Sequence, residues 1–336
     1  MAVVTIEELD PASLDEATLA QLAELATIEE RAFAPDDPPV EVAEVADELR
    51  VLPTFEERLL WVARDPDGRL LGRATLDIEH REENKHLAEV SLVVRPEDRR
   101  QGVGRRLLDD AAGRARTAGR TTLLGASPVG SDGAAAAQVL GAESVLVERI
   151  SRLRTAELDR SLLEAWVARA PERAAGYSLV AWDGRCPDEL LEPFAGIMAV
   201  MNTAPRGDMD MEDEFYTPEL IRDFEASIER KGTNVWTIAA RHDATGQLAG
   251  YTALFFPKHR PWQAEQGDTG VDPAHRDRGL GRWLKAVNLL RLLDERPEAQ
   301  VVDTGNAATN EPMLNINVAL GFRPLVEVAI LQRKLT

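Results

Sequence analysis

At two places in this chain, a run of strand-like positions is followed by a segment whose apolar positions have helical spacing. In the later case, the strand-like run Thr269-Gly270-Val271 ends just before Pro273. A helical spacing follows, with apolar positions at Trp283, Val287, Leu290 and Leu293. The pattern predicts a strand, a tight loop and a helix, in that order.

The loop between this strand and this helix contains the pattern Arg276-x-x-Gly279-x-Gly281. Glycine has no Cβ, so a ligand can approach its backbone and a positive φ costs little. The unpaired N–H groups of a helix start point at such a ligand, and the helix dipole favours an anion. With added charge from Arg278 and Arg282, we expect the loop to bind a pyrophosphate group.

The same arrangement occurs about 177 positions earlier, as Arg99-x-x-Gly102-x-Gly104 between a strand and a helix. Two copies at this distance indicate an internal repeat of domain size. A chain of 336 residues is also long enough for two cores. We therefore predict a first domain at 1–155, a connecting helix and linker at 156–175, and a second domain at 176–336.

Both halves are expected to follow one order: strand, two helices, three strands, helix, strand, helix, strand. In the first half the predicted strands are 3–8, 59–63, 70–78, 86–94, 121–126 and 144–152, and the helices are 14–33, 40–51, 103–118 and 133–140. In the second half the predicted strands are 177–182, 234–241, 248–256, 264–271, 299–303 and 326–333, and the helices are 187–201, 218–230, 280–293 and 310–320. Another helix, 157–170, is expected to connect the halves.

The charge and composition narrow the possible partners and surroundings. A net charge of −19 argues against nucleic acid, because phosphate binding needs a basic surface. The excess carboxylates either keep the protein soluble or attract a cationic acceptor. The single cysteine, Cys186, allows no intrachain disulfide and no cysteine-based metal site. We see no signal peptide and no apolar run of the ~20 residues that a membrane span needs, so we expect a cytoplasmic protein.

The pattern Val-x-Pro-x-x-Arg-x-x-Gly-x-Gly, on a strand, a loop and a helix, resembles the acyl-CoA pyrophosphate loop of the GNAT acyltransferase superfamily. It occurs here from Val94 to Gly104 and from Val271 to Gly281. It is neither a Walker A loop nor a dinucleotide fingerprint. The second copy also leads to Leu320-Gly321-Phe322, as is common in this family. The resemblance implies an α/β (α+β) fold of two tandem GNAT-like domains, each with a mixed, mostly antiparallel sheet flanked by helices.

In that family two neighbouring parallel strands separate and acyl-CoA lies between them. The resemblance implies that a backbone N–H of the strand before the loop serves as an oxyanion donor. It assigns this role to Gly270 and Val271 in the second unit and to Val93 and Val94 in the first. The implied CoA-binding residues of the loops are Arg276, Asp277, Arg278, Gly279, Leu280, Gly281 and Arg282, and, in the first unit, Arg99, Arg100, Gln101, Gly102, Val103, Gly104 and Arg105.

A carboxylate on the same strand often acts as the base in this family. Glu265 lies six residues before Val271 and is the first candidate. Asp268 is the second, and strand alternation places its side chain on the opposite face from Glu265. Counting back from the first loop puts Ala88 in register with Glu265. Glu89, one residue on, is the nearest candidate in the first unit, and whether its side chain faces the same way as that of Glu265 is left open.

The family's thiolate-protonating tyrosine is missing from both units. Asn317 stands at that position in the second unit and Ala137 in the first. The leaving thiol has a pKa of roughly 8.5, so the acid is either dispensable or replaced by water, and Asn317 remains a candidate for a weak bond to the sulfur. We expect Asn306 to bond the pantetheine arm or the acceptor. Asn310 either caps the following helix or joins Asn306.

An acidic loop between the first two helices of the second unit is expected to cover the acceptor site. Its carboxylates and ring suit a cationic amine by charge and by cation–π contact, although the same loop also fits a merely solvated surface. The candidate acceptor-binding residues are Asp208, Asp210, Glu212 and Tyr216. The five histidines show no metal spacing, and no metal is expected.

These points predict an acetyl-CoA-dependent N-acetyltransferase that acts on a small-molecule amine through a ternary complex, with the second unit catalytic. The two-unit layout resembles the mycothiol synthases in layout and general loop only. A non-catalytic CoA-binding sensor or scaffold, or an acyltransferase with a longer donor, remains an alternative. We expect a monomer or homodimer with no nucleic-acid or membrane partner.

Overall fold

The computed structural model describes residues 4–335 and divides into two compact units. Unit 1 comprises the described residues through Glu148, together with Arg206–Glu212 and the C-terminal stretch from Val326. Unit 2 comprises Arg149–Pro205 and Asp213–Leu325. The predicted start of the first strand, at residue 3, lies outside the described residues. No helix in the described part is long and apolar enough to cross a membrane.

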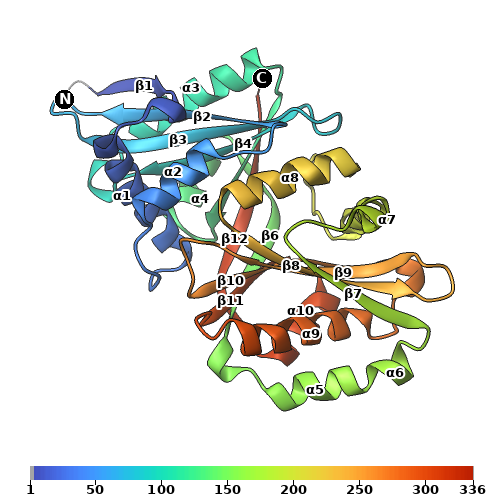
Figure 1. The fold of residues 1–336 in the computed structure, drawn as a ribbon. Coiled ribbons are helices and arrows are strands. Elements are labelled where there is room, and N and C mark those ends of the chain that lie inside the picture. Colours follow the sequence, from blue (N-terminus) through green and yellow to red (C-terminus); the bar gives the residue numbers. More distant parts are fainter. Residues whose placement is uncertain (1–3, 336) are drawn as a thin grey trace. The chain divides into compact units, whose positions relative to one another are not determined.

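The sheet of unit 1, in which β2 and β3 lie side by side in Figure 1, is mostly antiparallel, with one parallel pair, β4 and β5. Its strands, in sheet order, are β1 (Thr5–Leu9), β2 (Glu56–Arg64), β3 (Leu70–Glu79), β4 (Leu87–Val94), β5 (Thr122–Pro128) and β12 (Arg323–Lys334). Its helices are α1 (Glu16–Phe33), α2 (Val42–Arg50), α3 (Val103–Thr117) and α4 (Asp132–Val139), with short 3₁₀ turns η1 (Pro11–Ser13) and η2 (Pro96–Asp98).

Each face of this sheet buries one helical layer. Leu107 and Ala111 of α3 are fully buried in one core, together with Leu76 of β3. On the other face Leu22 of α1 packs in a second core with Leu60 of β2. The apolar spacing of the helices therefore reflects burial against the sheet.

The sheet of unit 2 repeats this plan, with the parallel pair β10 and β11 (Figure 1). Its strands are β7 (Tyr177–Asp183), β8 (Asn234–His242), β9 (Leu248–Phe256), β10 (Gln263–Val271) and β11 (Val301–Ala307), and β6 (Glu143–Arg154) starts in unit 1 and ends in unit 2. Its helices are α5 (Arg160–Ala168), α6 (Ala170–Arg173), α7 (Asp188–Met198), α8 (Pro218–Arg230), α9 (Leu280–Glu295) and α10 (Glu311–Leu320), with turns η3 (Thr155–Glu157), η4 (Ala199–Thr203) and η5 (Pro273–His275).

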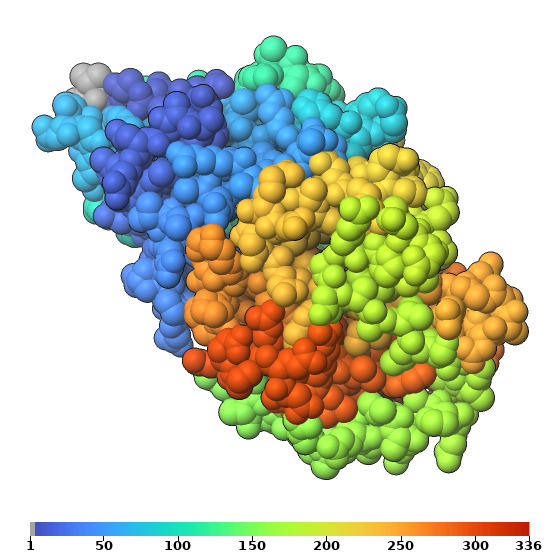
Figure 2. All heavy atoms as spheres, viewed as in Figure 1, coloured from blue at the N-terminus to red at the C-terminus, as the bar shows by residue number. Residues whose placement is uncertain are grey.

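Helix α9 is buried on more than one side because it lies between the sheet and α5. Leu289 and Leu292 pack in a core with Leu254 of the sheet, and Leu163 of α5 belongs to the same core. On the opposite face of the sheet, Phe194 of α7 packs with Tyr251. In Figure 2, α7 (yellow-green) and α8 (yellow), which contact one another, lie on the face of unit 2 turned toward the viewer.

These features confirm the predicted fold class: each unit is a mixed, mostly antiparallel sheet flanked by helices. The last strand differs from the sequence prediction, which placed it in the sheet of the second domain. From Val328 to Lys334, β12 pairs antiparallel with β5, in the sheet of unit 1. Leu335 completes the α3 core of that unit.

Candidate active site

The parallel strands of each unit pair only over their first residues and then separate. In unit 1, β4 and β5 pair from Leu87 to Glu89, although β4 continues to Val94. In unit 2, β10 and β11 pair from Gln263 to Glu265, although β10 continues to Val271. The continuation of β4 or β10 still pairs with β3 or β9 on its other edge, but no longer with the neighbouring parallel strand. We call this separation of the two parallel strands the strand divergence. The backbone N–H and C=O groups that point into the divergence are available to an extended ligand.

The loop after each diverging strand leads into an uncapped helix N-terminus. Gly102 and Gly279 precede α3 and α9 with φ of 86° and 78°, and no side chain caps either helix in the described chain. Arg100 and Asp277 take matching positive φ values of 62° and 64°. The free N–H groups of the first turns fit the oxygen atoms of a pyrophosphate group, so both loops have the predicted donor set.

Some loop arginines brace the loop. Arg99 and Arg276 both donate from Nε, at 3.1 and 3.0 Å, to the carbonyl oxygen of the last residue of the preceding strand. Arg276 also donates from Nη2 to Thr203 Oγ1 at 2.8 Å. We conclude that these two residues hold the loop conformation, while their predicted direct contact with CoA stays a prediction.

The surroundings of the two loops differ. The Arg173 side chain of α6 lies beside Gly279, and its Nε would be 3.6 Å from a Cβ on that glycine. A Cβ on Gly102, the equivalent glycine of unit 1, would have no such neighbour within 4 Å. The Arg278 guanidinium is 5.9 Å from the Tyr177 ring centroid. The Arg282 guanidinium is 5.4 Å from a Trp166 ring centroid. In unit 2, therefore, Arg173 adds a cation beside the loop from a separate helix.

The two candidate carboxylates of β10 share one face of the sheet, so the predicted opposite facing is wrong. Glu265 lies opposite Phe255 of β9, and Gly270 lies opposite Tyr251. Phe255 and Tyr251 are four residues apart and share a face, so Glu265 and Gly270 share it too, although five residues separate them. The register shift between Gln266 and Thr269 supplies the extra residue. Asp268, two residues before Gly270, accepts a hydrogen bond from Tyr251 Oη at 3.0 Å.

This bulge also changes which residue of unit 1 corresponds to Glu265. The pairing of β3 with β4 is regular, and Glu89 lies opposite Asp77. Glu89 is the last paired residue before the divergence of unit 1, as Glu265 is in unit 2. The structural counterpart of Glu265 is therefore Glu89, and the predicted alignment of Glu265 with Ala88 is wrong. Of the two alternatives for Glu89, the structure supports the one in which it faces the same way as Glu265. Both glutamates are exposed.

Asp268 lies on the α7 side of the sheet in a crowded but solvent-accessible position. Desolvation by the surrounding protein raises the pKa of its carboxyl, Glu214 adds to the rise, and the bond from Tyr251 opposes it. Glu214 is itself held in place, because Tyr216 donates to its Oε2 at 2.7 Å and Asn202 accepts from its backbone N–H at 3.0 Å. The structure thus brings Asp268 near Glu214, which the sequence analysis did not single out.

Asn317 is buried in a chain of hydrogen bonds. Its Oδ1 accepts from Lys285 Nζ at 3.0 Å, and its Nδ2 donates to Asn306 Oδ1 at 2.7 Å. Asn310 is not part of this chain. It caps α10 by accepting from Met313 N at 3.4 Å, which confirms the capping alternative. Lys285 was not predicted, although a lysine four residues after Gly281 in an apolar helix was a visible signal.

The predicted acceptor-binding residues do not form one group. Asp208, Asp210 and Glu212 belong to unit 1, and Tyr216 belongs to unit 2. The Asp210 carboxylate pairs with Lys334, and the Glu212 carboxylate accepts from the Asn84 backbone N–H at 2.8 Å. These contacts hold Arg206–Glu212 against unit 1. A role of the three carboxylates in binding an amine stays a prediction.

The predicted oxyanion donors lie in closely packed backbone. A Cβ on Gly270 would meet Val200 Cγ1 at 2.3 Å, so this glycine lets η4 pack directly on β10. Val93 and Val94 are both buried in the cores of unit 1. A Cβ on Gly72 would lie 2.6 Å from the carbonyl oxygen of Val93. In the same way, a Cβ on Gly250 would lie 2.7 Å from the carbonyl oxygen of Gly270. The two units thus place these strands alike.

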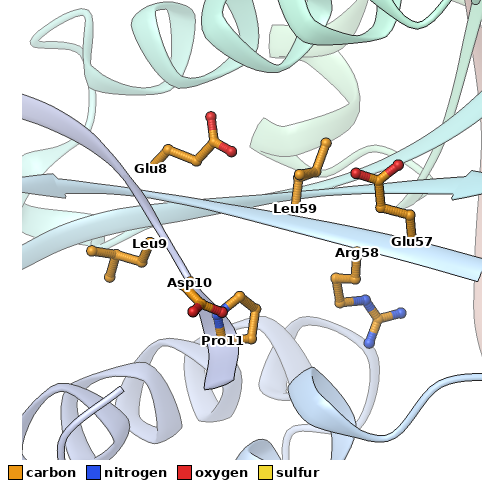
Figure 3. A pocket seen from close by; sticks show the side chains of 7 residues that line it. All are labelled: Glu8, Leu9, Asp10, Pro11, Glu57, Arg58 and Leu59. Carbon is orange, nitrogen blue, oxygen red and sulfur yellow. The ribbon is translucent and has the colours of Figure 1, made fainter. Parts of the chain in front are cut away.

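A hollow of about 440 Å³ lies elsewhere in unit 1, at β1 and β2 (Figure 3). Its lining residues are Glu8, Leu9, Asp10, Pro11, Glu57, Arg58 and Leu59. None of the predicted site residues is among them. Within residues 4–335, no cluster of three or more His, Cys, Asp or Glu side chains is arranged to hold a metal ion.

Comparison with known proteins agrees with this geometry. The sequence profile of the Acetyltransferase (GNAT) family matches residues 22–139 and again residues 201–313. Among solved structures, a tandem GNAT protein from the clavulanic acid biosynthesis pathway is 30% identical, with a TM-score of 0.81 and 99% of each chain covered. No curated protein matches.

Two further solved structures share the fold. A GCN5-related N-acetyltransferase from Sphaerobacter thermophilus is 16% identical, with a TM-score of 0.70 over 99% of this chain and 96% of that one. A glucosamine N-acetyltransferase region of a fungal multi-domain β-N-acetylglucosaminidase is also 16% identical, with a TM-score of 0.66 over 99% of this chain and 38% of that one. The twofold profile match and the 30% identical relative show that this chain belongs to the GNAT acetyltransferase family, as a tandem member with an acyl-CoA-dependent N-acyltransferase fold in each unit.

Proposed function

We propose that this protein transfers an acetyl group from acetyl-CoA to a primary amine of a small molecule, and that unit 2 carries the reaction. The observation that carries this proposal is the arrangement along β10. Its last paired residue is Glu265, its divergent part follows, and the uncapped N-terminus of α9 comes next. One strand therefore connects a carboxylate base to an anion site. The Acetyltransferase (GNAT) profile, which matches both halves of the chain, supports the choice of an acetyl donor.

The end of β10 next to α9 is proposed to bind the donor, and the end that pairs with β11 is proposed to carry the reaction. The free N–H groups at the start of α9 bind the pyrophosphate, with Arg278 and Arg282 nearby. The unpaired backbone of the divergence bonds the extended pantetheine arm. This arrangement brings the thioester carbonyl toward the paired end of the strand, where Glu265 lies.

Glu265 is the proposed base. The amine nitrogen attacks the thioester carbonyl carbon, a C–N bond forms and the C–S bond breaks. The proton lost by nitrogen goes to the Glu265 carboxylate, and the CoA thiolate takes a proton from solvent. A thiolate is a good leaving group, so the absence of tyrosine at position 317 does not prevent the reaction.

The acceptor is proposed to be a small cationic amine. Glu265 and Asp268 share the α7 face of the sheet, and Glu214 raises the Asp268 pKa from nearby. A cation placed among these carboxylates relieves their mutual repulsion. The Tyr251 and Tyr216 hydroxyls fix two of them, at 3.0 and 2.7 Å. These contacts favour an acceptor that carries a second positive charge besides the reacting amine.

The proposal is tested by following release of the CoA thiol from acetyl-CoA with a panel of mono-, di- and polyamines. We expect turnover with at least one dibasic amine. Glu265→Gln should lower kcat by about 10²-fold, the scale of losing a general base. The matched control is Glu89→Gln at the equivalent position of unit 1, which should leave kcat unchanged.

Three other results of these assays would contradict parts of the proposal. Equal loss in the two variants contradicts the assignment of the reaction to unit 2. Turnover with octanoyl-CoA but not acetyl-CoA replaces the proposed donor by a longer one. Binding of acetyl-CoA without turnover of any amine contradicts the enzymatic proposal and favours a CoA-binding scaffold.

A further inference from the structure

Unit 2 contains a lysine that is buried beneath the sheet with no carboxylate partner in the described chain. The Lys285 side chain on α9 is 1% exposed, and Asn317 Oδ1 is its acceptor. The Phe322 ring lies 5.8 Å from its Nζ. Burial lowers the pKa of this amine to about 7. An unpaired buried cation destabilises a fold, so the lysine needs a reason other than stability.

The lysine fixes the orientation of two amides. An amine can donate to an amide oxygen but the ammonium form cannot accept, so Oδ1 of Asn317 must point toward Lys285. Its Nδ2 then points away and donates to Asn306 Oδ1. This leaves Asn306 Nδ2 directed away from Asn317. Asn306 is partly exposed, and within residues 4–335 its side chain makes one hydrogen bond, through Oδ1, which leaves Nδ2 without an acceptor.

Asn306 occupies the strand divergence of unit 2. It lies in β11 three residues beyond Asp303, the last residue that pairs with β10. By alternation it shares the face of Val302, which packs in the α9 core. The free donor is thus carried by a strand that borders the proposed position of the pantetheine arm.

Unit 1 shows that the fold does not require this network. Lys285 lies four residues after Gly281, and the equivalent residue after Gly104 is Leu108, which packs in an apolar core. Counting back from the glycine that ends the last helix, the counterpart of Asn317 is Ala137. The polar chain is therefore an addition of unit 2, the unit proposed to be catalytic.

We propose that Lys285 is a positioning residue, which holds Asn317 and Asn306 so that Asn306 Nδ2 donates a hydrogen bond to the pantetheine arm of bound acyl-CoA. This inference rests on the proposed function. An amide group passes no proton in this geometry, so Lys285 acts through orientation and not as a general acid. The expected recipient is an amide carbonyl oxygen of the pantetheine arm.

The test compares Lys285→Met with Lys285→Gln by calorimetric titration with CoA. Both variants remove the charge and have similar volume, but only glutamine can donate to Asn317. Lys285→Met should weaken CoA binding about 5-fold to 10-fold, the scale of one hydrogen bond, and Lys285→Gln should stay within about 2-fold of the wild type. If the wild type binds two equivalents, the variants are made in the Gly104→Glu background so that only unit 2 reports.

A second variant reverses the network without changing its shape. Asn317→Asp keeps the acceptor for Lys285 but removes the donor to Asn306, so the Asn306 amide turns and presents its oxygen to the pantetheine arm. CoA binding should weaken by at least about 10-fold while thermal stability is kept. Leu108→Met, at the equivalent place in unit 1, should change neither.

Thermal stability separates positioning from a structural role. Lys285→Met removes a buried unpaired cation, so we expect its Tm to equal or exceed that of the wild type while binding weakens. A lower Tm, with Met and Gln equally impaired in binding, shows that the lysine is structural and overturns the inference. Unchanged CoA binding in Lys285→Met and Asn317→Asp also overturns it. A wild type that binds no CoA contradicts the proposed function itself.

Discussion

At the scale of single residues, the β-bulge in β10, which adds one residue to that strand, decides which face of the sheet each carboxylate lies on. Side-chain alternation predicted that Glu265 and Asp268 face opposite ways, and the bulge reverses this. The same count wrongly aligned Glu265 with Ala88 in place of Glu89. The identity of Glu265 as a candidate could be found from its spacing to Val271. The side chains that share a face with Glu265 could not be predicted, because one inserted residue moves every following side chain to the other face of the strand.

Asp268 gives a prediction at this scale. Its pKa is raised in the folded protein, so the folded state holds the proton more tightly than the unfolded chain does. Stability from the protonated carboxyl is present at low pH and is lost as the pH rises from the ordinary Asp value, near roughly 3.9, through the raised one. Asparagine keeps an acceptor for Tyr251 and does not titrate.

Asp268→Asn should therefore be more stable than the wild type at pH 7, and the difference should narrow as the pH falls toward about 4. Urea denaturation at a series of pH values measures this. A variant that is less stable at pH 7, or a difference that stays constant with pH, contradicts the raised pKa. Activity with the amine acceptor is expected to fall in the same variant.

At the scale of elements, the bulge of β10 has a visible cause in the sequence. Gly267 stands inside the register shift, and a Cβ there would lie 2.5 Å from Cε2 of Phe255. A glycine inside an alternating strand often marks a bulge or a close approach. The strand and helix order around both loops was predictable because periodicity and the loop glycines agree. The bulge was not predicted, although Gly267 and the extra residue relative to β4 signalled it.

Gly267→Ala tests this explanation of the bulge. The added methyl group clashes with the Phe255 ring, so we expect a loss of about 1–3 kcal/mol of unfolding free energy. The control is Gly196→Ala in α7, where a Cβ meets nothing within 4 Å and alanine favours the helix. Urea denaturation of the full chain compares the two. Equal stability of the two variants contradicts the close approach.

At the scale of the whole chain, the repeat predicted two units but not how the chain is shared between them. The final strand pairs with β5 of unit 1, and Arg206–Glu212 also belongs to unit 1. In both halves the parallel pair leaves an edge that can accept an antiparallel strand, so the sequence of the last strand does not specify its partner. The acidic loop was assigned to the second unit because it lies between two helices of that unit in the sequence, which does not show that Arg206–Glu212 packs in unit 1. The cytoplasmic location and the monomeric or homodimeric state stay predictions.

Calorimetric titration of the full chain with acetyl-CoA, on the wild type, Gly281→Glu and Gly281→Ala, tests the central claim that the start of α9 binds the donor. A Cβ at Gly281 makes only ordinary contacts, at 3.6 and 3.9 Å, and a carboxylate in the first helical turn favours the helix, so both variants should fold. We predict that the wild type and Gly281→Ala bind alike and that Gly281→Glu loses the equivalent bound by unit 2. A wild type that does not bind acetyl-CoA, or a Gly281→Glu variant that binds as the wild type does, contradicts the account.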